Sequence, residues 1–143
     1  MAPDDTTADR RGLMEAVGTV LAQGASRRDE AYVRLFATNP LPMWVYDVDT
    51  LQILDANDAA KAVYGYSLAE FRRLSLRDLR PHEDVPKFLE LIRQLPPFDR
   101  TGPWRHRKAD GTVVQVMITS LAMMFGSHKA RLVIVDNLDE TLR

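Results

Sequence analysis

The sequence contains no cysteine. Disulfide bonds, thiolate zinc sites and cysteine nucleophiles are therefore all excluded. A reducing, cytoplasmic location is the expectation that fits this composition. Apolar runs are also short, because none approaches the roughly 20 residues that a membrane-spanning helix needs. Residues 1–11 lack the apolar core of a signal peptide, so we expect neither a membrane span nor secretion.

An excess of charge of either sign is likewise missing. The 143 residues include 19 basic and 20 acidic side chains, which gives a net charge of −1. No overall field therefore favours nucleic acid or an anionic membrane as a partner. The short basic run at residues 104–108 is interpreted as the solvated end of a β-hairpin, not as a nucleic-acid site.

Catalytic motifs are absent too. The three histidines, His82, His106 and His128, fall in different predicted elements, and no Ser-His-Asp grouping is indicated. No glycine-rich loop offers a cradle for nucleotide phosphates. Paired carboxylates such as Glu83-Asp84 stand at predicted helix starts, where interactions with the helix dipole explain them. We therefore expect a domain that is not an enzyme and that has no catalytic residues or metal site.

What the sequence does contain is a regular succession of periodic segments. Spacings of three and four between apolar residues predict helices, and alternating runs bounded by turn residues predict strands. Three consecutive strands joined by short turns imply an antiparallel sheet with helices on one side, an α+β fold. In chain order the predicted elements are helices 10–23 and 26–38, strands 43–48 and 52–56, helices 59–64, 68–74, 76–79 and 85–95, and strands 98–108, 112–125 and 129–135.

Four local motifs stand in order between residues 38 and 141. They are Tyr46-Asp47 followed by Ile53-Leu54-Asp55-Ala56-Asn57-Asp58, then Tyr64-Gly65-Tyr66-Ser67 with Glu70-Phe71, then Pro81-His82-Glu83-Asp84-Val85, and finally Trp104-Arg105 with Lys108, Asp110-Gly111 and Thr112. In this order and spacing they resemble the PAS domain family. One departure is the end of the last strand, where the family's Asp-Ile/Val-Thr-Glu stands here as Asn137-Leu138-Asp139-Glu140.

The resemblance implies a PAS fold, a five-stranded antiparallel sheet with short helices on one face. It assigns residues 38–143 to the PAS domain and residues 1–37 to an N-terminal amphipathic helical extension that acts as a dimerisation cap. By the same resemblance, the domain is a sensory module for signal relay in a larger bacterial signalling protein. A sensor histidine kinase is the expected parent, and a diguanylate cyclase or phosphodiesterase is the alternative. The output domain lies elsewhere in that protein.

The alternation of strand residues indicates which side chains face the pocket that PAS sheets enclose. By resemblance, the inward positions of three strands are apolar except for one serine and one asparagine. Such a pocket suits a small apolar or aromatic ligand. A packed core without a ligand, in a pure protein-interaction module, is the alternative. The candidate pocket residues are Trp44, Tyr46, Phe71, Val116, Ile118, Ser120, Val133 and Asn137.

The opposite face of the predicted sheet is also apolar, which a sheet with one solvated face would not show. Either the N-terminal amphipathic helix or a second subunit must cover it. The resemblance implies that this surface serves dimerisation and signal output, so we expect a homodimer. The candidate residues are Leu13, Val17, Val20 and Leu21 of the first helix, and Met117, Leu121, Met123, Leu132 and Ile134 of the sheet.

No cofactor is predicted. Flavin photochemistry of the LOV type and attachment of a yellow-protein chromophore both need a cysteine, and so both are excluded. Haem-binding PAS domains use a histidine on the long helix, but His82 at its start is interpreted as a solvent-facing cap. His106 and His128 are expected to be exposed in a hairpin and a turn. Non-covalent flavin remains open, without a residue that signals it.

Overall fold

The computed structural model describes residues 27–139, and it begins with a helix on the outside of the molecule. This helix, α2 (Arg27–Thr38), agrees with the second predicted helix. The first predicted helix, with Leu13, Val17, Val20 and Leu21, lies outside the described residues. No helix within residues 27–139 is long and apolar enough to cross a membrane.

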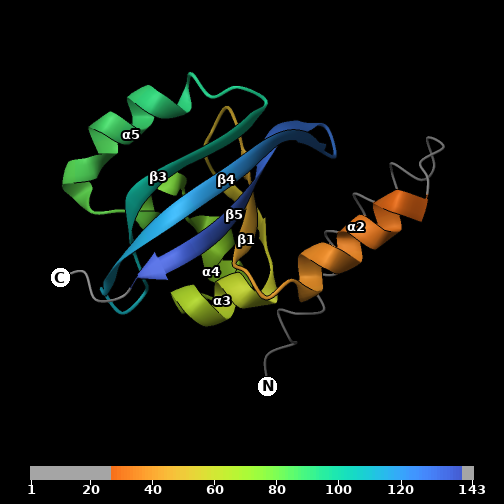
Figure 1. Ribbon diagram of the computed structural model, residues 1–143, viewed down its shortest axis with the longest axis horizontal. Coiled ribbons are helices and arrows are strands. Elements are labelled where there is room, and N and C mark those ends of the chain that lie inside the picture. Colours follow the sequence, from red (N-terminus) through yellow and green to blue (C-terminus); the bar gives the residue numbers. More distant parts are fainter. Residues whose placement is uncertain (1–26, 140–143) are drawn as a thin grey trace.

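The centre of the fold is one antiparallel sheet. Its first two strands are joined to its last three by the pairing of β1 with β5. The strand order is β2-β1-β5-β4-β3 (Figure 1). The predicted five-stranded antiparallel sheet is therefore confirmed, and the last strand continues four residues past its predicted end. The strands are β1 (Met43–Asp47), β2 (Ile53–Ala56), β3 (Phe98–Arg107), β4 (Val113–Phe125) and β5 (His128–Asp139).

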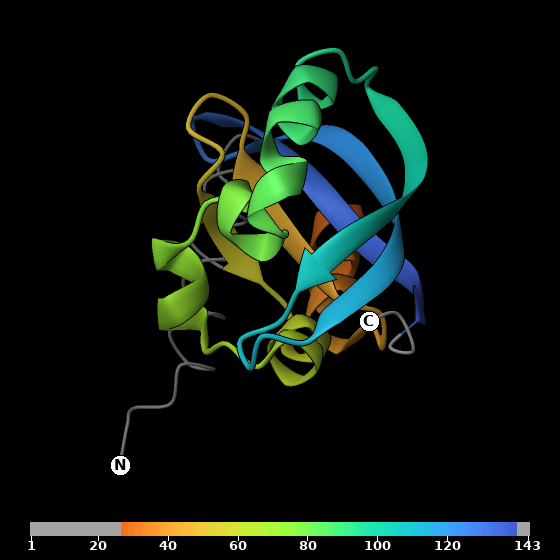
Figure 2. The same cartoon turned by 90° about the vertical axis from the view of Figure 1, so that its left-hand side faces the viewer.

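The segment between β2 and β3 forms the short helices, which cover the opposite face of the sheet from α2 (Figures 1 and 2). Ser67 accepts a hydrogen bond from the Glu70 amide and Glu70 accepts one from the Ser67 amide, which together form a capping box at the start of α4. The elements are α3 (Asp58–Tyr64), α4 (Leu68–Arg73), the 3-10 turns η1 (Leu76–Leu79) and η2 (His82–Asp84), and α5 (Val85–Ile92).

Helix α5 ends at Ile92, three residues before the predicted end at Leu95. Proline restricts the residue before it to extended backbone, and Pro96 follows Leu95 directly. The chain therefore leaves the helix early and turns toward β3. This shortening leaves the inner face of the sheet only partly covered at that end.

Buried apolar residues form two clusters, one on each face of the sheet. The inner cluster lies between the sheet and helices α3 to α5 and contains most of the large buried side chains, including Trp44, Tyr64 and Phe71. The outer cluster is smaller, and Phe36 of α2 contributes to it. Its buried members are Phe36, Met43, Val45, Ala130 and Leu132.

Both edges of the sheet are irregular. On β3, the pairing with β4 shifts between Thr101 and Trp104, around Gly102-Pro103, as the sequence predicts. Along β2, the segment after α4 forms hydrogen bonds with the outer edge of the strand. The Ile53 amide donates to the Leu74 carbonyl, and the Leu76 amide donates to the Leu51 carbonyl. Neither edge is therefore a straight, unpaired strand.

The hairpin between β3 and β4 is longer than the two-residue turn that Asp110-Gly111 predicts. The Lys108 amide donates to the Thr112 carbonyl and the Gly111 amide donates to the Lys108 carbonyl. Gly111 has a φ of +89°, which ordinary side chains rarely adopt. Three residues thus form the loop, with the glycine in the left-handed position.

Candidate functional site

A cavity of about 250 Å3 lies between α5 and the inner face of the sheet. Its walls come from β1, β3, β4 and β5, and its cover from η1, α5 and the segment that follows α5. Five predicted pocket residues line it, with aromatic, aliphatic and hydroxyl side chains. These are Trp44, Tyr46, Ile118, Ser120 and Val133.

Three other predicted pocket residues lie elsewhere. Phe71 and Val116 are fully buried in the inner cluster, where they pack against other side chains and do not reach the cavity. Asn137 is exposed and has a φ of 48°, next to a shift in the pairing of β5 with β4. This irregularity reverses the alternation, so Leu138 packs against the inner cluster in its place.

The floor of the cavity is one row of residues that crosses the sheet. Trp44 pairs with Val133, Val133 with Ser120, and Ser120 with Asp99. These four residues belong to β1, β5, β4 and β3, and all of them line the cavity. At the usual spacing between strands, the two ends of the row are about 14 Å apart.

Two buried polar atoms on this row have no hydrogen-bond partner among residues 27–139. They are Nε1 of Trp44 and one carboxylate oxygen, Oδ2, of Asp99. A buried donor or acceptor without a partner costs about 1 to 3 kcal/mol relative to one that is paired. One end of the row therefore has a free donor and the other end a free acceptor.

His106 is buried in the wall of this cavity, which corrects the expectation that it is exposed. Its Nδ1 lies 2.7 Å from the Tyr64 hydroxyl and its Nε2 lies 3.3 Å from a guanidinium nitrogen of Arg80. Since an arginine only donates, Nε2 accepts and the proton of the neutral ring is on Nδ1. Burial, together with the charge of Arg80, holds the pKa of His106 well below its ordinary value.

Arg80 is the buried cation of the site. Its Nε donates to the Leu76 carbonyl at 3.0 Å, and its guanidinium carbon lies 3.4 Å from the centre of the Phe88 ring. Burial lowers the pKa of Arg80 to about 10, so the side chain keeps its charge at neutral pH. Among residues 27–139, no carboxylate forms an ion pair with Arg80. The nearby carboxylate of Asp84 is paired with Arg105 instead, at 2.7 Å.

A second, wider hollow of about 650 Å3 adjoins the cavity and shares three of its lining residues, Tyr46, Ile92 and Leu95. It carries four basic side chains and a single acidic one. Arg131, the most buried of the basic ones, donates to the Ser120 hydroxyl at 2.8 Å. The charged residues around this hollow are Asp49, Arg77, Arg93, Lys129 and Arg131. We call it the basic vestibule.

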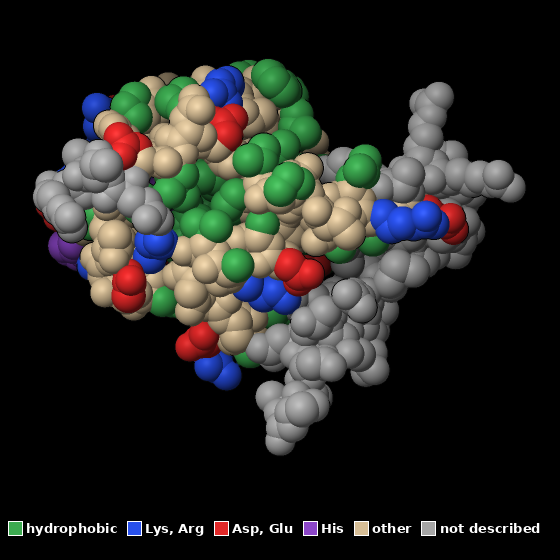
Figure 3. Space-filling model, turned by 60° about the horizontal axis from the view of Figure 1, so that its bottom comes forward, with side chains coloured by type: hydrophobic (Ala, Val, Ile, Leu, Met, Phe, Trp, Pro, Cys, Tyr) green, Lys and Arg blue, Asp and Glu red, His purple; other side chains and the backbone are tan. Residues whose placement is uncertain are grey.

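The outer face of the sheet is apolar, as the sequence predicts, and part of its cover comes from Phe36 of α2. Leu132 is only 1% exposed and belongs to this outer cluster. Leu121, Met123 and Ile134 are half-buried against the cluster, and Met117 is half-buried beside it. Hydrophobic side chains gather in a broad patch on the face of the molecule that Figure 3 shows.

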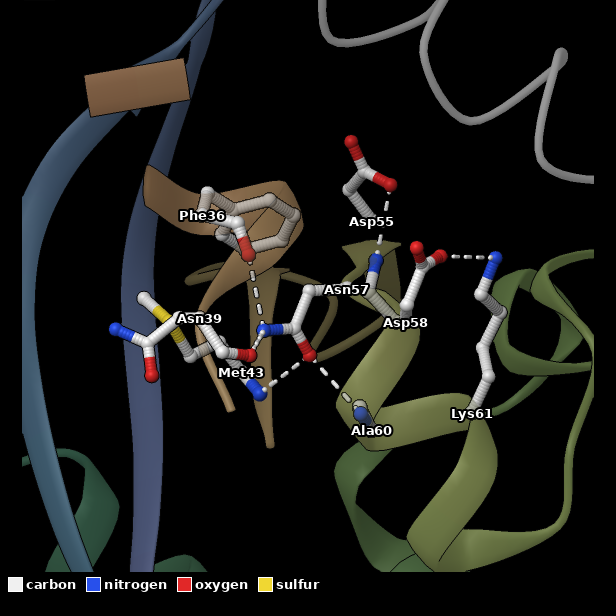
Figure 4. Close-up of polar contacts among 9 residues, drawn as sticks. Phe36, Asn39, Met43, Asp55, Asn57, Asp58, Ala60 and Lys61 are labelled. Atoms are coloured by element: carbon white, nitrogen blue, oxygen red, sulfur yellow. Dashed lines mark hydrogen bonds and ion pairs between the residues drawn. The ribbon is translucent and has the colours of Figure 1, made fainter. Parts of the chain in front are cut away.

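Asn57 connects α2 to the sheet and to α3 (Figure 4). Its Oδ1 accepts hydrogen bonds from the amides of Met43 and Ala60, both at 2.9 Å. Its Nδ2 donates to the carbonyls of Phe36 at 2.9 Å and Leu41 at 3.0 Å. The side chain thereby caps α3 and fixes the end of α2 beside the start of β1. We call this arrangement the Asn57 junction.

Three residues of the site, Arg80, His106 and Asp99, are not predicted from the sequence. A signal for His106 was present, because Trp104 and His106 are two residues apart on one strand and so face the same way. For Arg80 no comparable signal exists, since charged residues are rarely buried and nothing local marks this one. The exposed positions of His82 and His128 agree with the prediction.

Metal binding finds little support in these residues. Within residues 27–139, no group of three or more histidine or acidic side chains is arranged to hold a metal ion. The hydrogen bonds that both ring nitrogens of His106 make leave neither of them free as a ligand. The donor set of the cavity is therefore suited to hydrogen bonding rather than to metal coordination.

Comparison with solved structures shows which folds are similar. A domain of the sensory box sensor histidine kinase/response regulator from Geobacter sulfurreducens has a TM-score of 0.65 at 19% identity, covering 77% of this chain and 94% of that one. A PAS domain from a two-component sensor histidine kinase has a TM-score of 0.64 at 20% identity, covering 78% and 98%.

A third similar structure is the PAS domain, in complex with ethanol, of a LuxR-family transcriptional regulator from Burkholderia thailandensis. Its TM-score is 0.60 at 18% identity, covering 78% of this chain and 98% of that one. A comparison with curated proteins found no match. The family model described as "PAS domain" matches residues 40–140, which include all five strands of the sheet. The chain belongs to the PAS domain family.

Proposed function

We propose that this PAS domain is a sensory module that binds a small ligand in the cavity under α5 and relays occupancy to another part of a larger signalling protein. The observation that carries the proposal is the pair of unpartnered polar atoms, on Trp44 and Asp99, in the cavity wall. Buried polar atoms in packed cores nearly always have a partner, so two such atoms on one row of the cavity wall favour a missing partner. A ligand with one acceptor and one donor would satisfy both.

The size of the cavity favours a small organic ligand over a large cofactor. An apolar cavity of about 150 Å3 accommodates benzene, so about 250 Å3 corresponds to a ligand of about ten non-hydrogen atoms. A flavin or a haem is several times larger. The hydrogen bonds of His106 and the exposed position of His82 also argue against an iron ligand. We therefore expect no cofactor and no catalytic activity in this domain.

The Asn57 junction supplies a route for relay. It joins α2, the start of β1 and α3 through one buried side chain, and α3 carries Tyr64, which contacts His106 in the cavity wall. If these elements have two alternative packings, a ligand that binds one of them more tightly would shift the population toward that packing. The parent protein that best fits this role is a sensor histidine kinase; a diguanylate cyclase or phosphodiesterase is the alternative.

Homodimerisation is the second part of the proposal. The half-buried outer residues Leu121, Met123 and Ile134 leave an apolar surface that, among the described residues, α2 covers only in part. A second copy of the chain would bury it. Sedimentation of the whole chain should give a dimer, and Leu121→Glu should weaken it. A folded monomer at all concentrations would contradict this part.

Ligand binding is tested with a cavity-filling variant. Ile118→Phe places a ring in the cavity, while Val113→Phe adds the same kind of ring at a half-buried position of the same strand, outside the cavity and outside the proposed dimer contact, and serves as the control. Thermal unfolding is measured against a library of compounds of about ten non-hydrogen atoms. Compounds that raise the midpoint for the wild type and for Val113→Phe, but not for Ile118→Phe, support binding in the cavity.

The alternative function is a ligand-free interaction module. It would be favoured if native mass spectrometry finds no bound molecule and no compound stabilises the folded wild-type chain. In that case water would satisfy the Trp44 and Asp99 atoms. The two outcomes differ in the response of the wild type, so they do not depend on how well any variant folds.

A further inference from the structure

The cavity has a chemical polarity that identifies the class of ligand. At one end Trp44 lies beside His106, with ring centres 5.7 Å apart, and His106 contacts Arg80. At the other end of the floor row is Asp99. The first end therefore presents donors and a positive charge, and the second end presents an acceptor.

Arg80 has unused capacity for an anion. A guanidinium has five N–H donors, and those of Arg80 have two partners, the Leu76 carbonyl and Nε2 of His106. Three donors remain within the described residues, which supply no carboxylate for them. A buried cation without a paired anion is costly, and a ligand carboxylate would offset that cost with charge-assisted, bidentate hydrogen bonds.

Asp99 sets the requirement at the opposite end. Its Oδ2 is buried without a partner, so a ligand atom that reaches it must donate a hydrogen bond. A hydroxyl or amino group meets this requirement, whereas a second carboxylate would be repelled. The two ends together call for one acidic group and one donor on a single small molecule.

The middle of the cavity determines the body of the ligand. Ile118 and Val133 form an aliphatic floor, and Phe88 and Trp104 stand at 89° to each other with ring centres 6.1 Å apart. Flat aromatic rings pack well against such surfaces. With room for about ten non-hydrogen atoms, one six-membered ring and two small substituents fill the space.

The basic vestibule favours the same ligand class. It carries Arg77, Arg93, Lys129 and Arg131 against a single acidic residue, Asp49, although the whole chain has a net charge of −1. A concave surface of one charge sign raises the local concentration of the opposite ion and its rate of entry. The charge is therefore concentrated where a ligand would reach the cavity.

We propose that the cavity binds a small aromatic carboxylic acid with a hydroxyl or amino group at the far end of its ring, the carboxylate facing Arg80 and Trp44 and the donor facing Asp99. The inference rests on the proposed function, because it specifies the ligand of the same cavity. Entry is through the basic vestibule. The shared wall residues Tyr46, Ile92 and Leu95 mark where the two hollows meet.

The test compares three probes by titration calorimetry on the whole 143-residue chain. They are 4-hydroxybenzoate, its neutral analogue 4-hydroxybenzamide, and benzoate, which lacks the distal donor. A hydrogen bond to a charged group contributes enough to change affinity about 10- to 100-fold. We expect 4-hydroxybenzoate to bind at least about 10-fold more tightly than either analogue.

Two variants assign each preference to its residue. Arg80→Gln should abolish the preference for the acid over the amide, and Asp99→Asn should abolish the preference for the hydroxylated acid over benzoate. Arg93→Glu, at an exposed position of the vestibule, should weaken binding of the acid in low salt and have little effect in high salt. This last variant keeps the test decisive if Arg80→Gln does not fold.

The outcomes separate this inference from the proposed function. Equal affinity of acid and amide, or binding of the acid that Arg93→Glu leaves unchanged in low salt, would overturn the ligand class while ligand binding itself stands. Failure of all three probes, with stabilisation by other library compounds, would also overturn only the class. Failure of every compound would overturn both.

Discussion

The inner face of the sheet has two halves with opposite character. Under α3 and α4, side chains such as Tyr64, Leu68 and Phe71 are at most 1% exposed and fill the space completely. Under α5, the only buried residue of the helix is Phe88, and Leu91 is 40% exposed. The same sheet is thus a packed core on one side and the floor of a cavity on the other.

This difference indicates where the domain can respond to a ligand. Segments with few buried apolar contacts open locally at low free-energy cost, whereas densely packed ones open only with the whole fold. The packed half, which we call the α3–α4 half, therefore acts as a scaffold. A ligand that fills the α5 half adds the contacts that are missing there and orders its cover.

The largest expected effect tests the contrast directly with one substitution made in both halves. Leu79→Ala removes a side chain that is fully buried in the inner cluster, and should lower the free energy of unfolding by about 2 to 5 kcal/mol. Leu91→Ala, in the exposed part of α5, should lower it by less than about 1 kcal/mol. Urea denaturation of both variants measures the difference. Equal losses would show that α5 is as firmly packed as the rest.

The second prediction concerns a variant that leaves buried polar atoms without partners in the packed half, as those of Trp44 and Asp99 are in the cavity. Asn57→Ala leaves the buried amides of Met43 and Ala60 without acceptors, and should cost about 2 to 4 kcal/mol of unfolding free energy. Asn57→Asp keeps an acceptor for both amides and loses the donors to Phe36 and Leu41. Its second carboxylate oxygen would face those two carbonyl oxygens at a buried position, so Asn57→Asp should cost at least as much as Asn57→Ala.

Hydrogen exchange separates the two roles of Asn57. In Asn57→Asp, amides of α2 should lose protection while those of α3 keep it, because only the attachment of α2 is removed. A uniform loss of protection throughout the domain would mean that the Asn57 junction acts on stability alone. That result would remove the support it gives to relay.

The third and smallest effect depends on pH and concerns His106, at the border of the two halves. Its folded-state pKa lies below the ordinary value of 6.5, so the unfolded chain binds the proton more readily. The stability that neutral His106 provides is present above pH 6.5 and is lost as the pH falls below it. Lowering the pH from roughly 7.5 to 5.5 should cost on the order of 1 kcal/mol through this residue.

Urea denaturation at both pH values measures this loss. His106→Gln should remove this pH dependence, while His82→Gln, a change at an exposed histidine, should retain it. Both variants carry the same substitution, so their difference isolates the buried ring. An unchanged pH dependence in His106→Gln would mean that the histidine is not held neutral in the fold.

The elements that the sequence predicts best are those whose structure local chemistry alone determines. Asn57, Gly65 and the Ser67-Glu70 pair mark helix ends through hydrogen bonds to their own neighbours, and α3 and α4 lie where helices 59–64 and 68–74 are predicted. Trp44 and Tyr46 both face inward, as alternation along β1 predicts, although the pairing of β1 with β2 shifts between Val45 and Tyr46. The fold followed from these signals.

The cavity could not be predicted in the same way, because it depends on how elements far apart in the sequence pack against one another. The irregularity at Gly102-Pro103 shifts the alternation in β3, so Asp99 on one side of it and His106 on the other both line the cavity although they do not share one alternating series. The shift in β5 likewise reverses the alternation at Asn137. An empty volume is a property of the distance between α5 and the sheet, and no residue pattern encodes it locally.

The irregular edges of the sheet also limit how molecules of this protein can assemble. Pro103 has no amide hydrogen to offer along β3, and the shift beside it bends the strand. The other edge is already occupied by the segment from Leu74 to Leu76. A strand from a neighbouring molecule therefore finds no straight template on which to grow a continuous sheet. Crowded copies of the domain are accordingly protected from fibrous aggregation, and specific association is left to its faces.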